Sequence, residues 1–215
     1  FLHQAGIPAP GLYRQIPLWP CWPLLMRNVS RQQAEFAPGT KTAYHLVNYG
    51  FIFGEVVRRV TGLPVDEYAR QTFFRPMGLQ NTWLRLPRRE LPRSPRLVAT
   101  SPALRQATFL FNLPIIRCAL NPAAGLHSTA AELAACFQML LDGGQYGGRR
   151  LLQTDTVAAA TRSGYDGWDD YIKVNIHWGH GLILGGGRHR EGTPEQWPFG
   201  QGSTDRTFGA LGLGT

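Results

Sequence analysis

The chain has 215 residues, a net charge of +8, 43% hydrophobic residues and only 17% charged residues. This size and apolar content allow a folded core and exclude a disordered chain or a coiled coil. No apolar run is long enough to cross a bilayer, so we expect a soluble protein without a membrane span. The compartment is left unknown, with the cytoplasm slightly favoured, and the lack of a hydrophobic leader after Phe1 says little about it.

The basic surplus raises the question of nucleic-acid binding. Nearly all of the basic residues are arginines, since the only lysines are Lys41 and Lys173. Many arginines alternate with prolines between residues 85 and 105, and no nucleic-acid-binding motif accompanies them. We interpret residues 85–118 as a long, solvated Arg/Pro-rich loop and expect no nucleic-acid partner. A nucleic-acid binder remains an alternative, which predicts binding that weakens steeply with salt.

The first half of the chain predicts helices. Residues 1–35 are rich in Pro and Trp and predict an extended covering segment that ends in a short helix. Apolar residues recur at helical spacing from about Val47 to Val60, and Gly62 predicts the end of this helix. A second helix is predicted from Asp66 to Phe74, which Pro76 would stop.

After the Arg/Pro-rich stretch, Phe109 to Ile116 predicts a short strand or the wall of a cleft. A further helix is expected to begin after Thr129. This residue suits an N-cap, and Glu132 three residues later completes the spacing of a capping box. The glycines at 143–144 predict the end of that helix.

The last third of the chain changes character. A glycine-flanked turn is expected at 145–152, and a helix near Thr156 to Thr161. From Asn175 onward, short apolar runs between glycines predict strands that form hairpins, including Phe208 to Leu213. Helices followed by short antiparallel strands indicate an α+β fold.

Several segments resemble the serine β-lactamase-like hydrolases, which include class C β-lactamases, D-alanyl-D-alanine carboxypeptidases and related esterases. The esterase-like and LACTB-like members are the most similar. The segments that carry the resemblance, in family order, are His3–Ile7, Phe36–Thr40, Tyr44–Val57, Gly54–Gly62, Phe74–Thr82, Asn121–Ala130, Met139–Gly144 and Gly148–Leu152. The resemblance implies a single β-lactamase-related domain over residues 1–215, with a helical region and an antiparallel sheet.

The chemistry implied by the resemblance is acyl transfer. A serine attacks an ester, amide or β-lactam carbonyl, a lysine three residues later takes its proton, and a tyrosine assists. Tyr44 stands at the first place of the family's Tyr-x-Asn motif and is the expected catalytic residue. Leu46 occupies the Asn position, while Asn48 lies two residues further along. We expect His45 and Asn48 to contact the substrate.

The family's third motif is Lys-Thr-Gly or His-x-Gly. By order it falls on Gln201, Gly202 and Ser203, which are therefore expected to bind the substrate. The neutral Gln201 stands where the family motif has a positively charged residue, and this difference favours an esterase-like substrate preference. No metal or cofactor is expected, because His177 and His180 lack the His-Glu-x-x-His form of a zinc site.

The nucleophile box of the family, Ser-x-x-Lys, is absent from these residues. The positions three residues before the two lysines hold Pro38 and Asp170. One hypothesis is an incomplete serine hydrolase whose N-terminal elements are missing, acting on a small ester, peptide or β-lactam-like ligand and inactive alone. The other is a degenerate, non-catalytic homologue that binds a ligand or serves as a scaffold.

Overall fold

The computed structural model describes residues 1–8, 15–186, 199 and 203–210. The chain forms two compact units. Unit 1 comprises Phe1–Pro8, Ala34–His45 and Ala134–Thr215, and unit 2 comprises Ala9–Gln33 and Leu46–Leu133. Helices and antiparallel strands are both present, which confirms the predicted α+β class.

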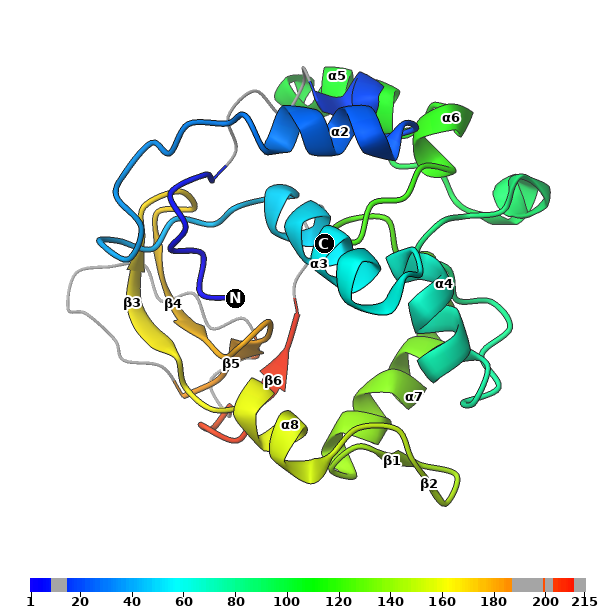
Figure 1. The fold of residues 1–215 in the computed structure, drawn as a ribbon, viewed down its shortest axis with the longest axis vertical. Helices are drawn as coiled ribbons and strands as arrows, with labels where there is room; N and C mark the ends of the chain where they lie inside the picture. Colours follow the sequence, from blue (N-terminus) through cyan, green and yellow to red (C-terminus); the bar gives the residue numbers. More distant parts are fainter. Residues whose placement is uncertain (9–14, 187–198, 200–202, 211–215) are drawn as a thin grey trace. The chain divides into compact units, whose positions relative to one another are not determined.

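Unit 2 is helical (Figure 1). Its elements are η1 (Ile16–Leu18), α2 (Trp22–Val29), α3 (Asn48–Thr61), α4 (Val65–Ala69), η2 (Arg70–Phe74), η3 (Arg88–Arg93), η4 (Pro102–Leu104), α5 (Arg105–Phe111) and α6 (Pro114–Arg117). Its core includes Trp19, Leu25 and Phe51, and the rings of Trp19 and Phe51 lie 5.9 Å apart. Full burial of a side chain such as Phe51 contributes roughly 1.5–3 kcal/mol. Residues 15–29, expected to cover the fold, thus supply part of this core.

Helix α3 ends as predicted. Gly62 has φ +75° and donates its N–H to the carbonyl oxygen of Arg58, which is the left-handed cap that favours glycine. Gly54 allows α2 to approach closely, since a Cβ there would lie 2.9 Å from the ring of Trp22. At this contact the indole N–H of Trp22 donates to the carboxylate of Glu55 at 2.9 Å.

The expected strand at Phe109–Ile116 is wrong, because the segment forms α5 and then α6. Apolar residues in a short run suit a strand or a buried helix equally well, and Pro114 starts α6 with the backbone angle that a first helical turn needs. Phe111 of α5 and Ile116 of α6 line a cavity in unit 2.

Helix α7 (Ala130–Leu141) begins as its sequence predicts, with one difference. The hydroxyl of Thr129 accepts the N–H of Glu132 at 3.2 Å, which confirms the N-cap. The carboxylate of Glu132 accepts hydrogen bonds from the N–H of Asn81 at 3.0 Å and from the hydroxyl of Thr82 at 2.6 Å. The Glu132 side chain therefore ties residues 80–82 to α7.

Unit 1 contains a four-stranded antiparallel sheet in the order β3-β4-β5-β6, coloured from yellow to red in Figure 1. Its elements are β1 (Gln145–Tyr146), β2 (Arg149–Arg150), α8 (Thr154–Ala160), β3 (Tyr165–Asp169), β4 (Val174–Trp178), β5 (Ile183–Leu184) and β6 (Phe208–Gly209). Strands β1 and β2 form the expected turn through Gly147 and Gly148, whose φ values of +54° and +76° suit a tight hairpin.

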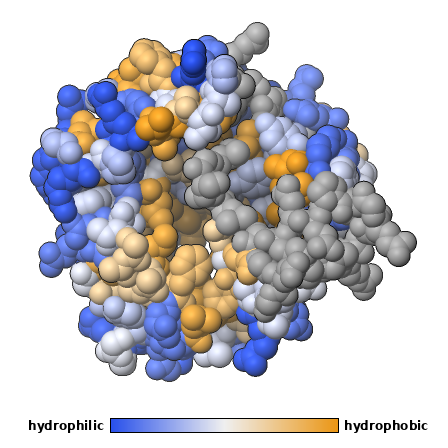
Figure 2. Space-filling view, turned by 180° about the vertical axis from the view of Figure 1, so that it is seen from behind, coloured by the Kyte–Doolittle hydropathy of each residue, from blue (hydrophilic) through white to orange (hydrophobic). Residues whose placement is uncertain are grey.

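Large hydrophobic side chains remain on the surface of both units. Val60 is 80% exposed, Val98 84%, Phe109 66% and Leu141 65%. Figure 2 shows such hydrophobic residues lying between hydrophilic ones on one face of the molecule. Among the described residues, no helix has the length and apolar character that crossing a bilayer requires.

Candidate active site around Tyr44

Tyr44 lies in an extended part of unit 1, between two other segments of the same unit. On one side, the N–H of Ala43 donates to the carbonyl oxygen of His3 at 3.0 Å. On the other, the N–H of Asp170 donates to the carbonyl oxygen of Thr42 at 2.9 Å. Backbone hydrogen bonds therefore fix the chain immediately before Tyr44 to the N-terminal segment and to the β3–β4 hairpin.

The buried carboxylate of Asp169 makes a second connection. It is 0% exposed, and its Oδ1 atom accepts the N–H of Tyr44 at 3.1 Å. The same oxygen accepts the N–H groups of Tyr171 at 2.9 Å and Ile172 at 3.0 Å, which shape the turn after β3. Three backbone N–H groups donate to this one oxygen, so the side chain anchors Tyr44 to the hairpin.

The ring of Tyr44 packs between two other rings. The Trp178 ring is nearly parallel to it, with centroids 5.9 Å apart and an interplanar angle of 11°. The edge-on ring of His3 has its centroid at 4.7 Å. Contacts of this kind contribute roughly 0.5–1.5 kcal/mol each beyond the area they bury. The side chain of Tyr44 is thus held in one orientation while staying half-buried.

Two histidines support this arrangement through hydrogen bonds that fix their tautomers. Nδ1 of His3 accepts the backbone N–H of His45 at 3.1 Å, and Nε2 of His45 accepts the N–H of Ile7 at 3.2 Å. Nδ1 of His45 then donates to the carbonyl oxygen of Ala43 at 2.6 Å. An accepting ring nitrogen carries no proton, so both imidazoles are neutral in this arrangement.

The environment of both rings favours the neutral form. Burial, followed by the proximity of His45, lowers the pKa of His3 to about 3. Burial also lowers the pKa of His45 from its usual value, although the hydrogen bond to Ala43 opposes the shift. Neither ring therefore adds positive charge beside Tyr44 at neutral pH.

The predicted substrate-binding residues are placed as follows. Both ring nitrogens of His45 are engaged by the backbone, and Asn48 lies in unit 2, where its amide donates to Gln32 at 2.9 Å. Ser203 lies in unit 1 beside Gly185 at the end of β5. Gln201 and Gly202 lie outside the described residues. Tyr44 and His45 are neighbours in the sequence, and contact of any of these residues with a substrate stays a prediction.

Sequence reasoning missed three residues that position Tyr44. Trp178 directly follows His177 in the sequence, and nothing in this local sequence predicts its contact with the tyrosine ring. His3 occurs in one of the segments that resemble the family, but nothing there predicts its contact with the tyrosine ring. Asp169 is 125 residues from Tyr44 in sequence, and no local pattern connects them.

The histidines of the His177-x-x-His180 pair have hydrogen-bonding partners in unit 1. Nδ1 of His177 lies 2.8 Å from the carbonyl oxygen of Gly185, and its Nε2 lies 2.9 Å from the hydroxyl of Ser163. Nδ1 of His180 lies 3.1 Å from the carbonyl oxygen of Ala159. The described part of the chain holds no group of three or more side chains placed to bind a metal ion.

Comparison with known proteins connects this geometry to one family. The β-lactamase family model matches residues 2–215. A putative D-alanyl-D-alanine carboxypeptidase from Salmonella typhi is 28% identical over 151 residues, which cover 62% of this chain and 34% of that protein. The chain thus spans about a third of the length of this curated relative.

Solved structures share the fold. A penicillin-binding protein homologue from Caulobacter crescentus is 27% identical with a TM-score of 0.69, covering 91% of this chain and 58% of that one. A family VIII carboxylesterase is 28% identical with a TM-score of 0.74, covering 85% and 53%. The extent of the family match and the agreement in fold show that this chain belongs to the β-lactamase family.

Proposed function

We propose that the chain is the tyrosine-bearing part of a serine hydrolase that transfers acyl groups from ester or amide carbonyls. One observation carries this proposal. Tyr44 is anchored through its backbone to the buried Asp169, and its ring is held between Trp178 and His3. A side chain that assists proton transfer must be held in a fixed position, and this arrangement supplies that.

Within that reaction Tyr44 assists the lysine that takes the proton of the serine. The similarity to a carboxylesterase and to a putative D-alanyl-D-alanine carboxypeptidase supports an acyl substrate. We further propose a preference for esters, because Gln201 stands where the family carries a cation that attracts a substrate carboxylate. Small esters, peptides and β-lactam-like compounds are the ligand classes to test.

We also propose that these 215 residues do not hydrolyse esters alone. Neither lysine has a serine three residues before it. Lys41 forms an ion pair with Asp170 at 3.1 Å, and Lys173 lies in the β3–β4 turn with φ +59°. Neither is on a helix beside a serine, where a Ser-x-x-Lys box would place both side chains on one face.

A non-catalytic homologue is the second candidate, and two observations favour it. Leu46 stands at the Asn position of Tyr-x-Asn and adopts φ +42°, a left-handed conformation that Asn adopts more readily than Leu. Both ring nitrogens of His45 are already engaged by the backbone. A protein of this kind would bind an acyl or peptide ligand without turning it over.

The hydrolase and the non-catalytic homologue are distinguished by an assay of p-nitrophenyl butyrate hydrolysis. The assay uses the protein made from the complete coding sequence. The hydrolase proposal predicts turnover that Tyr44→Phe lowers about 10²–10⁴-fold, the usual contribution of a positioned acid or base. Tyr146→Phe, in the β1–β2 hairpin, is the matched control and should leave the rate unchanged. No turnover by the wild type, or equal rates for Tyr44→Phe and wild type, would favour the non-catalytic homologue.

A further inference from the structure

Unit 2 contains a partly open cavity of about 360 Å³ that the chemistry around Tyr44 does not use. This volume lies near the lower end of the range for pockets that bind small molecules. Much of the wall is apolar, and the apolar side chains that line it include Trp19, Leu86, Leu97, Phe111, Ile116 and Leu126. All of the lining residues belong to unit 2.

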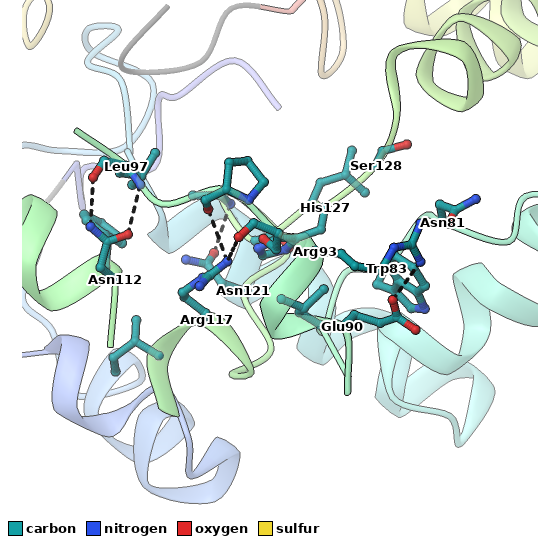
Figure 3. Close-up of a pocket in the computed structure, with 18 of the residues that line it drawn as sticks. Asn81, Trp83, Glu90, Arg93, Leu97, Asn112, Arg117, Asn121, His127 and Ser128 are labelled. Carbon is teal, nitrogen blue, oxygen red and sulfur yellow. Dashed lines mark hydrogen bonds and ion pairs between the residues drawn. The ribbon is translucent and has the colours of Figure 1, made fainter. Parts of the chain in front are cut away.

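Side chains tie the loop over the cavity to the helices beneath it (Figure 3). Nη2 of Arg117, at the end of α6, donates to the carbonyl oxygens of Ser94 at 2.7 Å and Pro95 at 3.1 Å. The amide of Asn112 makes two hydrogen bonds with the backbone of Leu97, at 2.9 Å and 2.8 Å. The cavity is thus held open by a hydrogen-bonded frame.

The charge of the lining is positive. Arg117 is half-buried, and none of the described carboxylates lies within ion-pair distance of it. Glu90, the acidic residue of the lining, is paired with Arg93 at 2.9 Å and with Arg89 at 3.3 Å. Its charge is therefore compensated within the η3 turn, and the charge of Arg117 is left to attract an anion.

Two buried donors of the lining lack an acceptor. Trp19 is only 3% exposed, and its indole Nε1 has no hydrogen-bond partner among the described residues. The hydroxyl of Ser94 is likewise buried without a partner in the described part of the chain. An indole N–H can only donate, and a buried donor that remains unpaired destabilises the fold. Both groups would be satisfied by oxygen acceptors.

We propose that this cavity binds a small carboxylate with an apolar body, of the size of an arylalkanoate or a short fatty acid. The carboxylate accepts a hydrogen bond from Nε or Nη1 of Arg117, neither of which donates to a described residue. The apolar body packs against Trp19, Phe111 and the neighbouring aliphatic side chains. This binding does not depend on Tyr44 or on the proposed hydrolysis.

The test is titration of the purified chain with 4-phenylbutyrate, followed by tryptophan fluorescence excited at a wavelength where the ligand does not absorb. Trp19 and Trp83 both line the cavity and report on its occupancy. Two probes of the same shape are 4-phenylbutanol, which is neutral, and 4-phenylbutylamine, which is cationic. We expect saturable binding of the carboxylate, at least tenfold weaker binding of the alcohol, and none of the amine.

Three variants locate the site. Arg117→Gln removes the charge and should weaken binding of 4-phenylbutyrate at least tenfold. Because Arg117 also holds the loop, Ala124→Phe serves as a second variant. This exposed lining residue sits at the surface, and a large side chain there should block entry without altering the charge. Arg88→Gln, which removes an exposed charge from the same loop outside the lining, should change the affinity less than twofold.

The proposal is overturned if the alcohol or the amine binds as tightly as the carboxylate. It is also overturned if 4-phenylbutyrate does not bind, or if its affinity is unchanged in both Arg117→Gln and Ala124→Phe.

Discussion

The backbone N–H of Tyr44 donates to the buried carboxylate of Asp169 at 3.1 Å, across 125 residues of sequence. This bond fixes the expected catalytic tyrosine to the turn that follows β3. Because the same oxygen holds the N–H groups of Tyr171 and Ile172, the position of Tyr44 and the shape of the hairpin depend on one side chain.

Replacing Asp169 should therefore destabilise the fold. We expect Asp169→Ala to lower the free energy of unfolding by about 2–3 kcal/mol, because buried N–H groups lose their acceptor. Chemical denaturation of the purified variant measures the change. Asp170→Ala is the matched control, since this neighbouring carboxylate is partly exposed and forms an ion pair with Lys41 at the surface. Equal losses in the two variants would contradict the anchoring role of Asp169.

Stability should fall in mild acid because of the two neutral histidines. The pKa of His3 is lowered to about 3 in the fold, whereas an unfolded histidine takes up its proton near pH 6.5. Between these values the unfolded chain binds more protons, so the free energy of unfolding decreases as pH falls. The slope is at most about 1.4 kcal/mol per pH unit for each histidine.

Thermal denaturation of wild type and His3→Gln from pH 7.5 to 4 checks this. The slope in the variant should be smaller than in the wild type. A wild-type melting temperature that stays constant from pH 6.5 to 4 would rule out neutral, buried imidazoles at these positions.

Gly54 should resist substitution although it lies inside a helix. An Ala in a helix interior is normally more stable than Gly by about 0.8–1.0 kcal/mol. Here the new Cβ would lie 2.9 Å from the ring of Trp22 and 3.2 Å from Pro122, so the ring must shift. We expect Gly54→Ala to destabilise the fold by about 1–3 kcal/mol, as overpacking does. Val60→Ala, at an exposed site of the same helix, should have little effect, and a gain in stability for Gly54→Ala would refute the close packing.

The expectations from sequence succeeded where one local pattern was sufficient. Helix α3 was predicted from the spacing of its apolar residues and from the glycine that follows it. Gly62 adopts the left-handed conformation that ends a helix in this way. The N-cap of α7 was predicted from Thr129, but the carboxylate of Glu132 bonds instead to residues 80–82, which no local rule anticipates. Strand β3 was not predicted, because apolar and polar residues do not alternate along its sequence. It is paired with β4 along its whole length.

The same limit applies to the site. Tyr44 was identified because it belongs to a motif, whereas Asp169 and Trp178 reach it through the sheet. The hydrogen-bonded frame of the cavity in unit 2 joins residues 15 to 23 positions apart, within a stretch interpreted as a solvated loop. The contacts around Tyr44 and the frame of the cavity therefore depend on tertiary interactions, which no local sequence pattern predicts.

Leu46 should be a strained position. Its φ of +42° is unfavourable for a leucine by about 1–2 kcal/mol, and asparagine adopts it more easily. We expect Leu46→Asn to raise the free energy of unfolding by about 0.5–1 kcal/mol, while Leu46→Ala, which removes the side chain without relieving the backbone, should not. Urea denaturation of the two variants makes the comparison, and destabilisation by both would contradict strain at this residue.

We propose that these residues supply the assisting tyrosine of an acyl-transfer site but not its nucleophile. The most direct measurement is covalent labelling of the protein from the complete coding sequence with a serine-reactive phosphonate, followed by peptide mass spectrometry. We predict one labelled serine, in a Ser-x-x-Lys sequence outside residues 1–215, and much slower labelling in Tyr44→Phe. A labelled serine within these residues, or labelling that Tyr44→Phe does not slow, would contradict the claim.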